Sequence, residues 1–267
     1  MRAMVLVAGA VFRESVRDRV PYSMVMFAIL LMAASYAISQ LTAGQDMKII
    51  KDLGLASMSV FGMLIAVFLG IGLVSKEVER KSIFALLAKP VTRTQFVLGK
   101  YLGLVATLVI NLAVMTLAFY AVLAFMDLTA GPEKLVWPAP ALDPRLLIAI
   151  LLIIAEVAVV TAVALFFSTF SSPLLSALLT LGLWTAGHFG SDLRNFGTVV
   201  DSAPMIAIAR VLYYVLPNLA PFDVKAEVVH GFPVAARHVA YTLAYGGLYA
   251  GVLLTAAVAI FRRRDFK

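Results

Sequence analysis

Long apolar runs alternate with short polar segments along most of the chain, and the length of these runs predicts its structure. A helix needs about 20 consecutive, mostly apolar residues to cross a bilayer, because hydrocarbon offers no hydrogen-bond partners to the backbone. Six runs meet this requirement and predict an all-α membrane protein with six spans: 22–41, 53–74, 101–126, 146–167, 173–191 and 240–261. Because we find no repeat or soluble domain, we expect residues 1–267 to form a single transmembrane domain.

Two shorter apolar segments predict helices that do not cross the membrane. Residues 3–19 combine apolar and charged positions and are closed by Pro21, which is typical of an amphipathic helix lying in the cytoplasmic interface. The apolar segment 204–216 has only about 13 residues, a length more typical of re-entrant or interfacial helices. We therefore expect residues 192–239 to form an external loop with one or two short helices that dip toward the membrane.

Composition and charge support this interpretation and orient the chain. The mean hydropathy is +0.97 and 14% of the residues are charged, whereas soluble domains have roughly 25% charged residues. With the N-terminus inside, 14 of the 22 Lys and Arg residues fall on the cytoplasmic side, as the positive-inside rule favours. We expect a multi-pass protein of the cytoplasmic (inner) membrane of a prokaryote, with both termini in the cytoplasm.

The remaining charge and cysteine data add little to this prediction. The net charge of +7 is explained by topology and attraction to anionic lipid, and does not call for nucleic acid. Arg13, Arg17 and Arg19 precede the first apolar run and no small-residue cleavage site follows it, so we do not expect a cleaved signal peptide. The chain has no cysteine, which leaves the redox compartment open.

The sequence offers little that would carry catalysis. No G-x-x-x-x-G-K-[ST] loop is present to hold a nucleotide phosphate, and the three histidines lack zinc-ligand spacing. His188, near the outer end of the fifth span, is expected to be an interfacial polar residue rather than a ligand. We expect no catalytic residue, no metal site and no cofactor in this polypeptide.

Residues 75–100 place a dense group of charges between the second and third spans. In SKEVERKSIFALLAK, apolar positions lie beside clustered charges, which predicts an amphipathic helix of about 15 residues that ends before Pro90. A second short helix is expected to start at Thr92 or Thr94 and to run into the third span. The charges either only fix the topology of a solvated loop or belong to a stiff cytoplasmic projection.

The same segment carries the spaced motif E-x-E-x-[RK]-[ST]-I-x-x-L-L-x-K-P-[VI]-[ST]-R-x-x-F-x-x-G-K. Its positions are filled by Glu77, Glu79, Lys81, Ser82, Ile83, Leu86, Leu87, Lys89, Pro90, Val91, Thr92, Arg93, Phe96, Gly99 and Lys100. This motif resembles the loop between the second and third spans of ABC-2 type transporter permeases. The resemblance covers essentially the full chain. It is closest to the branch with the nitrous-oxide-reductase maturation permease and the gliding-motility permeases.

The resemblance implies a permease dimer, most simply a homodimer, bound to two copies of a separate ATPase subunit that carries ATP and Mg. An accessory protein on the periplasmic or extracellular side is a further possible partner. The amphipathic segment would be the coupling helix that docks in a cleft of each ATPase, so that ATP-driven closure moves the spans. The residues implied in this contact are Glu77, Glu79, Arg80, Lys81, Ser82, Ile83, Phe84, Leu87, Pro90 and Arg93.

Two polar residues lie inside the predicted spans. Glu156 is about 11 residues from the outer end of the fourth span, near the midplane, and Asn111 lies at a similar depth in the third span, so the two could form a hydrogen bond. They are candidates for the substrate path, or for a protonated, packed carboxyl that joins helices. The small-residue stripes Gly62, Ala66, Gly70 and Gly247, Gly251 indicate close helix packing.

Three functions remain compatible with the sequence. The first is the permease subunit of an ATP-driven exporter. The second is an ion-coupled secondary transporter, which usually shows internal repeats and several midplane charges. The third is a membrane scaffold through which an ATPase partner transmits a mechanical signal. The substrate is left open.

Overall fold

The computed structural model describes residues 2–39, 46–79, 92–129, 139–190, 194–195, 200 and 202–263, and all elements within these ranges are helices. Five of the described helices are long and apolar enough to cross a membrane. They are α2 (Arg19–Ser39), α3 (Asp46–Glu79), α5 (Arg93–Thr129), α6 (Leu146–Ser168) and α11 (Ala236–Arg263). The prediction of an all-helical membrane protein is therefore confirmed.

The predicted span at 173–191 forms a shorter helix, α7 (Pro173–His188), which is not among these five candidates. Its 16 residues reach about 24 Å, less than the roughly 30 Å of a hydrocarbon core. Ser172 caps its start by accepting a hydrogen bond from the Leu175 N–H at 3.4 Å. Hydropathy therefore located the helix, but the apolar run extends beyond the point where the helix ends.

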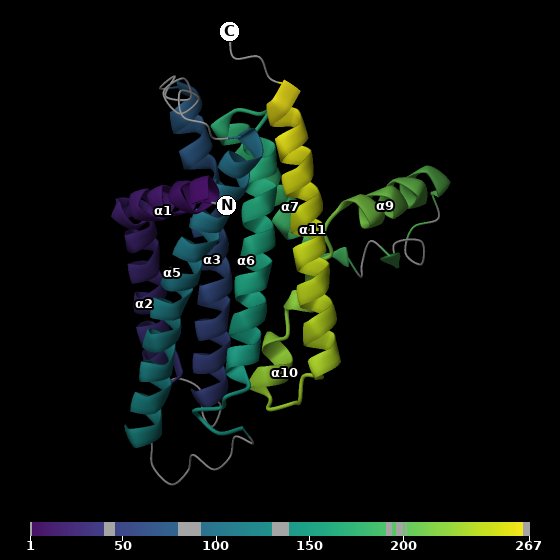
Figure 1. Ribbon diagram of the computed structural model, residues 1–267. Coiled ribbons are helices and arrows are strands. Elements are labelled where there is room, and N and C mark those ends of the chain that lie inside the picture. The colour runs from purple at the N-terminus through teal and green to yellow at the C-terminus, as the bar shows by residue number, and fades with distance from the viewer. Residues whose placement is uncertain are drawn as a thin grey trace.

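The five long helices form a bundle in which α3, α6 and α11 run in one direction and α2 and α5 in the other (Figure 1). α3 packs against α2, α5 and α6, and α11 packs mainly against α6. Gly62 and Gly70 allow close approach on α3, because a Cβ on Gly70 would lie 2.8 Å from Ala164 Cβ on α6. The expected close packing at Gly247 and Gly251 is not found among the described residues, since none of them comes within 4 Å of a Cβ built on either glycine.

The predicted N-terminal helix is present as α1 (Arg2–Arg17), which lies across the first turns of α5 (Figure 1). Two glycines on α5 make room for it: a Cβ on Gly99 would lie 2.8 Å from the Met4 carbonyl oxygen, and one on Gly103 would lie 2.6 Å from that of Ala8. Because backbone approaches backbone here, no larger residue fits at either position without displacing α1.

Residues 202–235 contain short helices, as expected: α9 (Ala203–Val215), the 3-10 helix η3 (Ala220–Phe222) and α10 (Lys225–Val229). α9 projects sideways from the bundle (Figure 1). The following segment instead packs tightly, because Leu219, Phe222, Val228 and Val229 are all at most 1% exposed and η3 and α10 contact α6. Part of the region expected to be a loop therefore belongs to the core.

Candidate functional site: the coupling region and an intramembrane carboxylate

The predicted coupling segment follows directly from α3. This helix continues past its apolar part to Glu79, so Glu77 and Glu79 belong to its last turn. The other predicted coupling residues up to Pro90 lie outside the described residues, namely Arg80, Lys81, Ser82, Ile83, Phe84, Leu87 and Pro90. The structure resumes at Thr92.

Thr92 and Gln95 form a reciprocal cap at the start of α5. The Gln95 N–H donates to Thr92 Oγ1 at 3.3 Å, and the Thr92 N–H donates to Gln95 Oε1 at 3.1 Å. This capping box fixes where the helix begins, because it satisfies two amide groups that have no partner inside the helix. The predicted start at Thr92 or Thr94 is confirmed to within one residue, and the helix runs without a break into the span.

Arg93 joins the start of α5 to the end of α11. Its Nη1 donates to the Phe261 carbonyl oxygen at 2.6 Å, and the rings of Phe96 and Phe261 stack with their centres 5.9 Å apart. Lys100 is 1% exposed and holds its Nζ 4.6 Å from the centre of the Phe96 ring. Arg93, expected at the rim of an ATPase contact, thus binds a carbonyl in the last turn of α11, where helices lack donors.

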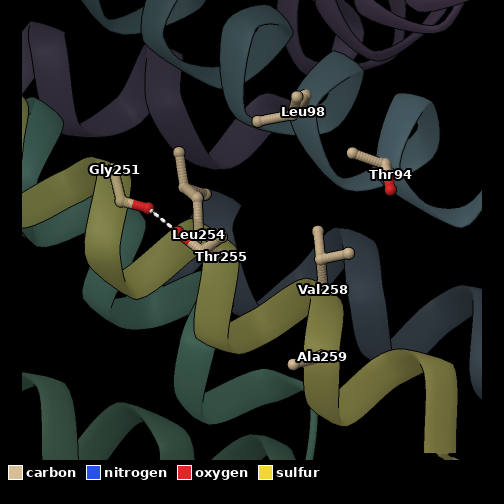
Figure 2. Close-up of a pocket in the computed structure, with 7 residues that line it drawn as sticks. All are labelled: Thr94, Leu98, Gly251, Leu254, Thr255, Val258 and Ala259. Atoms are coloured by element: carbon tan, nitrogen blue, oxygen red, sulfur yellow. Dashed lines mark hydrogen bonds between the residues drawn. The ribbon is translucent and has the colours of Figure 1, made fainter.

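An apolar groove opens beside this contact, between the first turns of α5 and the second half of α11 (Figure 2). Its volume is about 510 Å³. The Thr255 hydroxyl donates to the Gly251 carbonyl oxygen of its own helix, so it offers no donor to the groove. The lining residues are Thr94, Leu98, Gly251, Leu254, Thr255, Val258 and Ala259.

Glu156, halfway along α6, is 1% exposed and interacts with two side chains of α7. Its Oε1 accepts a hydrogen bond from Trp184 Nε1 at 2.6 Å and lies 3.4 Å from His188 Nε2. His188 Nδ1 in turn lies 2.9 Å from the Trp184 carbonyl oxygen. His188, expected to be an interfacial residue, therefore lies next to a buried carboxyl group. Sequence reasoning missed this partner.

Asn111 does not form the predicted hydrogen bond with Glu156. The Asn111 Nδ2 atom is buried without a partner, and so is the second carboxyl oxygen of Glu156, Oε2. The reason is direction: the Glu156 carboxyl group is turned toward Trp184 on α7, whereas Asn111 belongs to α5. Both remain buried polar groups with unused hydrogen-bonding capacity.

A second buried polar cluster, which sequence reasoning did not identify, lies at the other end of the bundle. Lys51 is fully buried and donates from Nζ to the Pro140 carbonyl oxygen at 2.7 Å. Asp143 is 2% exposed; its carbonyl oxygen accepts from the Tyr120 hydroxyl at 3.1 Å, and its Oδ1 accepts from the Arg145 N–H at 2.9 Å. These contacts tie α3 and α5 to the segment that leads into α6.

No cluster of three or more His, Asp or Glu side chains within the described part of the chain could hold a metal ion.

Comparison with known protein families gives a match over residues 5–266 to the family described as "ABC-2 family transporter protein". The match spans nearly the whole chain, from α1 to the segment after α11. A comparison with curated proteins finds no match.

Proposed function

This chain belongs to the ABC-2 family of transporter proteins, and from that premise we propose that two copies of it couple ATP hydrolysis by separate ATPase subunits to movement of a substrate across the membrane. Family membership makes the chain a permease subunit of an ABC transporter. The proposal adds three points to family membership: the permease forms a homodimer, it binds two ATPase copies, and it exports its substrate. The narrower branch with the nitrous-oxide-reductase maturation and gliding-motility permeases stays a prediction.

The observation that carries the proposal is how both ends of the segment 80–91 are held. α3 continues as one helix to Glu79, and α5 starts at a capping box whose next residue, Arg93, is bonded to α11. A force applied to this segment would therefore act on α3 and α5 directly and on α11 through Arg93. This arrangement suits a coupling helix, in which Glu77 and Glu79 pair with the ATPase at the rim and Ile83, Phe84 and Leu87 fill its cleft.

ATP chemistry belongs to the partner in this proposal. The sequence has no phosphate-binding loop of the P-loop type, so ATP and Mg bind the ATPase subunit and this chain contributes movement. The permease subunit is non-catalytic by itself.

A sixth crossing is made by α7 together with the segment that follows α9. The Leu219 N–H donates to the Gly187 carbonyl oxygen at 2.9 Å, so residues 217–229 continue along α6 from the place where α7 ends. Such broken crossings are tolerated where the irregular backbone is buried in protein. With six crossings both termini lie on one side, and the excess of Lys and Arg on that side supports the cytoplasm. The inner membrane of a prokaryote is the proposed location.

Asn111 and Glu156 are the proposed polar groups of the substrate path. The support is that each buries an atom with no hydrogen-bond partner, Nδ2 and Oε2, inside a candidate span. Buried polar groups without partners are uncommon, and in spans they mark functional sites by default.

Co-purification of the ATPase with permease variants tests the proposal. Reversing both Glu77 and Glu79 to Lys should weaken ATPase binding, because removing one partner of a desolvated interfacial charge pair costs about 2–5 kcal/mol. Phe84→Ala should act in the same direction by emptying an apolar contact. Glu227→Lys on α10, an exposed charge reversal at the opposite end of the bundle, serves as the control.

Full complex formation and full ATP turnover by both coupling variants would contradict the proposal and leave the segment as a topology signal. Transport by the permease without any ATPase would instead favour the ion-coupled alternative. Stimulated ATP turnover without movement of any substrate would favour the scaffold that transmits a mechanical signal.

A further inference from the structure

The hydrogen bonds of His188 restrict where its ring can carry protons. Nδ1 lies 2.9 Å from the Trp184 carbonyl oxygen, which can only accept a hydrogen bond. Nδ1 is therefore the protonated nitrogen. In a neutral imidazole the other nitrogen, Nε2, then carries no proton and presents a lone pair. That nitrogen faces Glu156 Oε1 at 3.4 Å.

An ionised Glu156 beside a neutral His188 would place two acceptors against each other. Adding one proton between Nε2 and Oε1 removes the conflict, whether this proton is counted on the ring or on the carboxyl group. We infer that Glu156 and His188 form a proton-binding site inside the membrane domain, which holds one shared proton and joins α6 to α7. This inference goes beyond the coupling function and does not depend on it.

Burial favours the state with one proton. Glu156 is 1% exposed, and the His188 side chain is 22% exposed. With one proton the pair has no net charge, whereas losing it or adding a second leaves an uncompensated charge in a low-dielectric site. Trp184 Nε1 donates to the same Oε1, and His188 is the last residue of α7, where the helix dipole favours a cation.

The ionisable groups on the neighbouring elements do not replace this proton. On α11 these are Tyr245 and Tyr249, and on α5 Tyr101 donates to the Ala158 carbonyl oxygen at 3.3 Å. After η3, Asp223 and Lys225 pair with each other at 3.3 Å and offset each other's charge. Exposed Glu227 lies on α10, whereas α3 has no ionisable residue from 53 to 71.

The composition of the chain makes the proton observable. The sequence has only three histidines, so nitrogen-15 labelling of histidine gives few ring signals. His230→Asn and His238→Asn, at sites away from Glu156, identify the His188 signals by elimination. Infrared spectra of the same protein report whether the Glu156 carboxyl group is protonated, by difference from Glu156→Gln. That variant keeps the shape of the side chain and an acceptor for Trp184.

The site predicts that at about pH 7 either Nε2 of His188 or the carboxyl group of Glu156 is protonated. It also predicts that Glu156→Gln changes the His188 ring signals at the same pH, because the amide cannot share a proton with Nε2 as the carboxyl group does. An ionised carboxyl group beside a bare Nε2 in the unaltered protein would overturn the inference. So would His188 ring signals that are the same in both proteins. The first outcome is read from the unaltered protein, so it holds even if the variant does not fold.

Discussion

Arg93 donates a hydrogen bond to the carbonyl oxygen of Phe261, a residue 168 positions further along the chain. The contact joins the first residue of α5 to the last turn of α11, next to the segment proposed to meet the ATPase. Because the rings of Phe96 and Phe261 stack beside it, the two helix ends form one unit. Movement of one of these helix ends therefore carries the other with it.

Arg93→Ala should lower the stability of the permease, because a hydrogen bond from a charged group is worth about 1.5–3 kcal/mol. Thermal unfolding in detergent measures the loss. Arg237→Ala, which removes an arginine 5.2 Å from the ring centre of Tyr241 at the other end of the bundle, should cost less than about 1 kcal/mol. Equal stability of Arg93→Ala and the unaltered protein would show that the contact does not hold the helices together.

Gly103→Ala should displace α1 and destabilise the protein by about 1–3 kcal/mol, because the added Cβ would lie 2.6 Å from the Ala8 carbonyl oxygen. Gly9→Ala is the matched control, since a Cβ there meets nothing within 4 Å and alanine favours helix by up to about 1 kcal/mol. Thermal unfolding and limited proteolysis of α1 compare the two variants. Similar unfolding temperatures for both variants would contradict the close packing of α1 against Gly103.

Trp184→Phe should destabilise the packing of α7 on α6 by about 1–3 kcal/mol, because it removes a donor from the buried Glu156 carboxyl group. Adding Glu156→Gln to Trp184→Phe should cost less than the two separate changes together, since both alter one interaction. A double-mutant cycle of unfolding free energies measures this. Strict additivity would mean that the indole and the carboxyl group do not interact.

Lys51→Met should also destabilise the protein, although methionine keeps an apolar body of similar length. The change leaves the Pro140 carbonyl oxygen without its donor and removes the cation near Asp143, at a cost of about 1–3 kcal/mol. The paired change of Lys48 to Met, one helical turn earlier, provides the comparison within α3. An unfolding temperature that is unchanged by Lys51→Met would show that this buried ammonium group contributes no stability.

A reporter protein fused after residue 263 should be active only on the cytoplasmic side, because six crossings return the chain to the side of its N-terminus. A second reporter fused at residue 232, between α10 and α11, gives an independent reading of the side reached once residues 217–229 have completed the crossing begun by α7. Activity of the C-terminal fusion only outside the cytoplasm would contradict six crossings and support an odd number of crossings.

Hydropathy predicted most of the fold because crossing a membrane is a matter of length and apolar character. The ranges of α2, α3, α5, α6 and α11 follow from it, and the start of α5 follows from the polar pair at 92 and 95. The predicted span at 173–191 failed the length criterion because α7 ends at His188. Hydropathy measures how apolar a run is, and it does not report where backbone hydrogen bonding stops.

The polar contacts could not be predicted from the sequence in the same way. Glu156 was identified because a carboxyl group inside a span has a high free-energy cost. Its hydrogen-bond donor, Trp184, is 28 residues away on a helix whose rotation about its own axis the sequence does not specify. Depth alone suggested Asn111 as the partner, because depth fixes one coordinate of a side chain and leaves its direction open. The burial of Lys51 was not predicted for a similar reason, since its acceptor is a carbonyl 89 positions away.

The packing of α1 against Gly99 and Gly103 of α5 also has a consequence for biosynthesis. Gly103 is made roughly 95 residues after Ala8, and at about 5–20 residues per second the ribosome needs roughly 5–20 s to cover that distance. During this interval α1 has no protein surface to rest on, and only lipid headgroups and its own apolar positions can hold it. The amphipathic character of this helix therefore serves the nascent chain first, and the finished bundle replaces the lipid as its support.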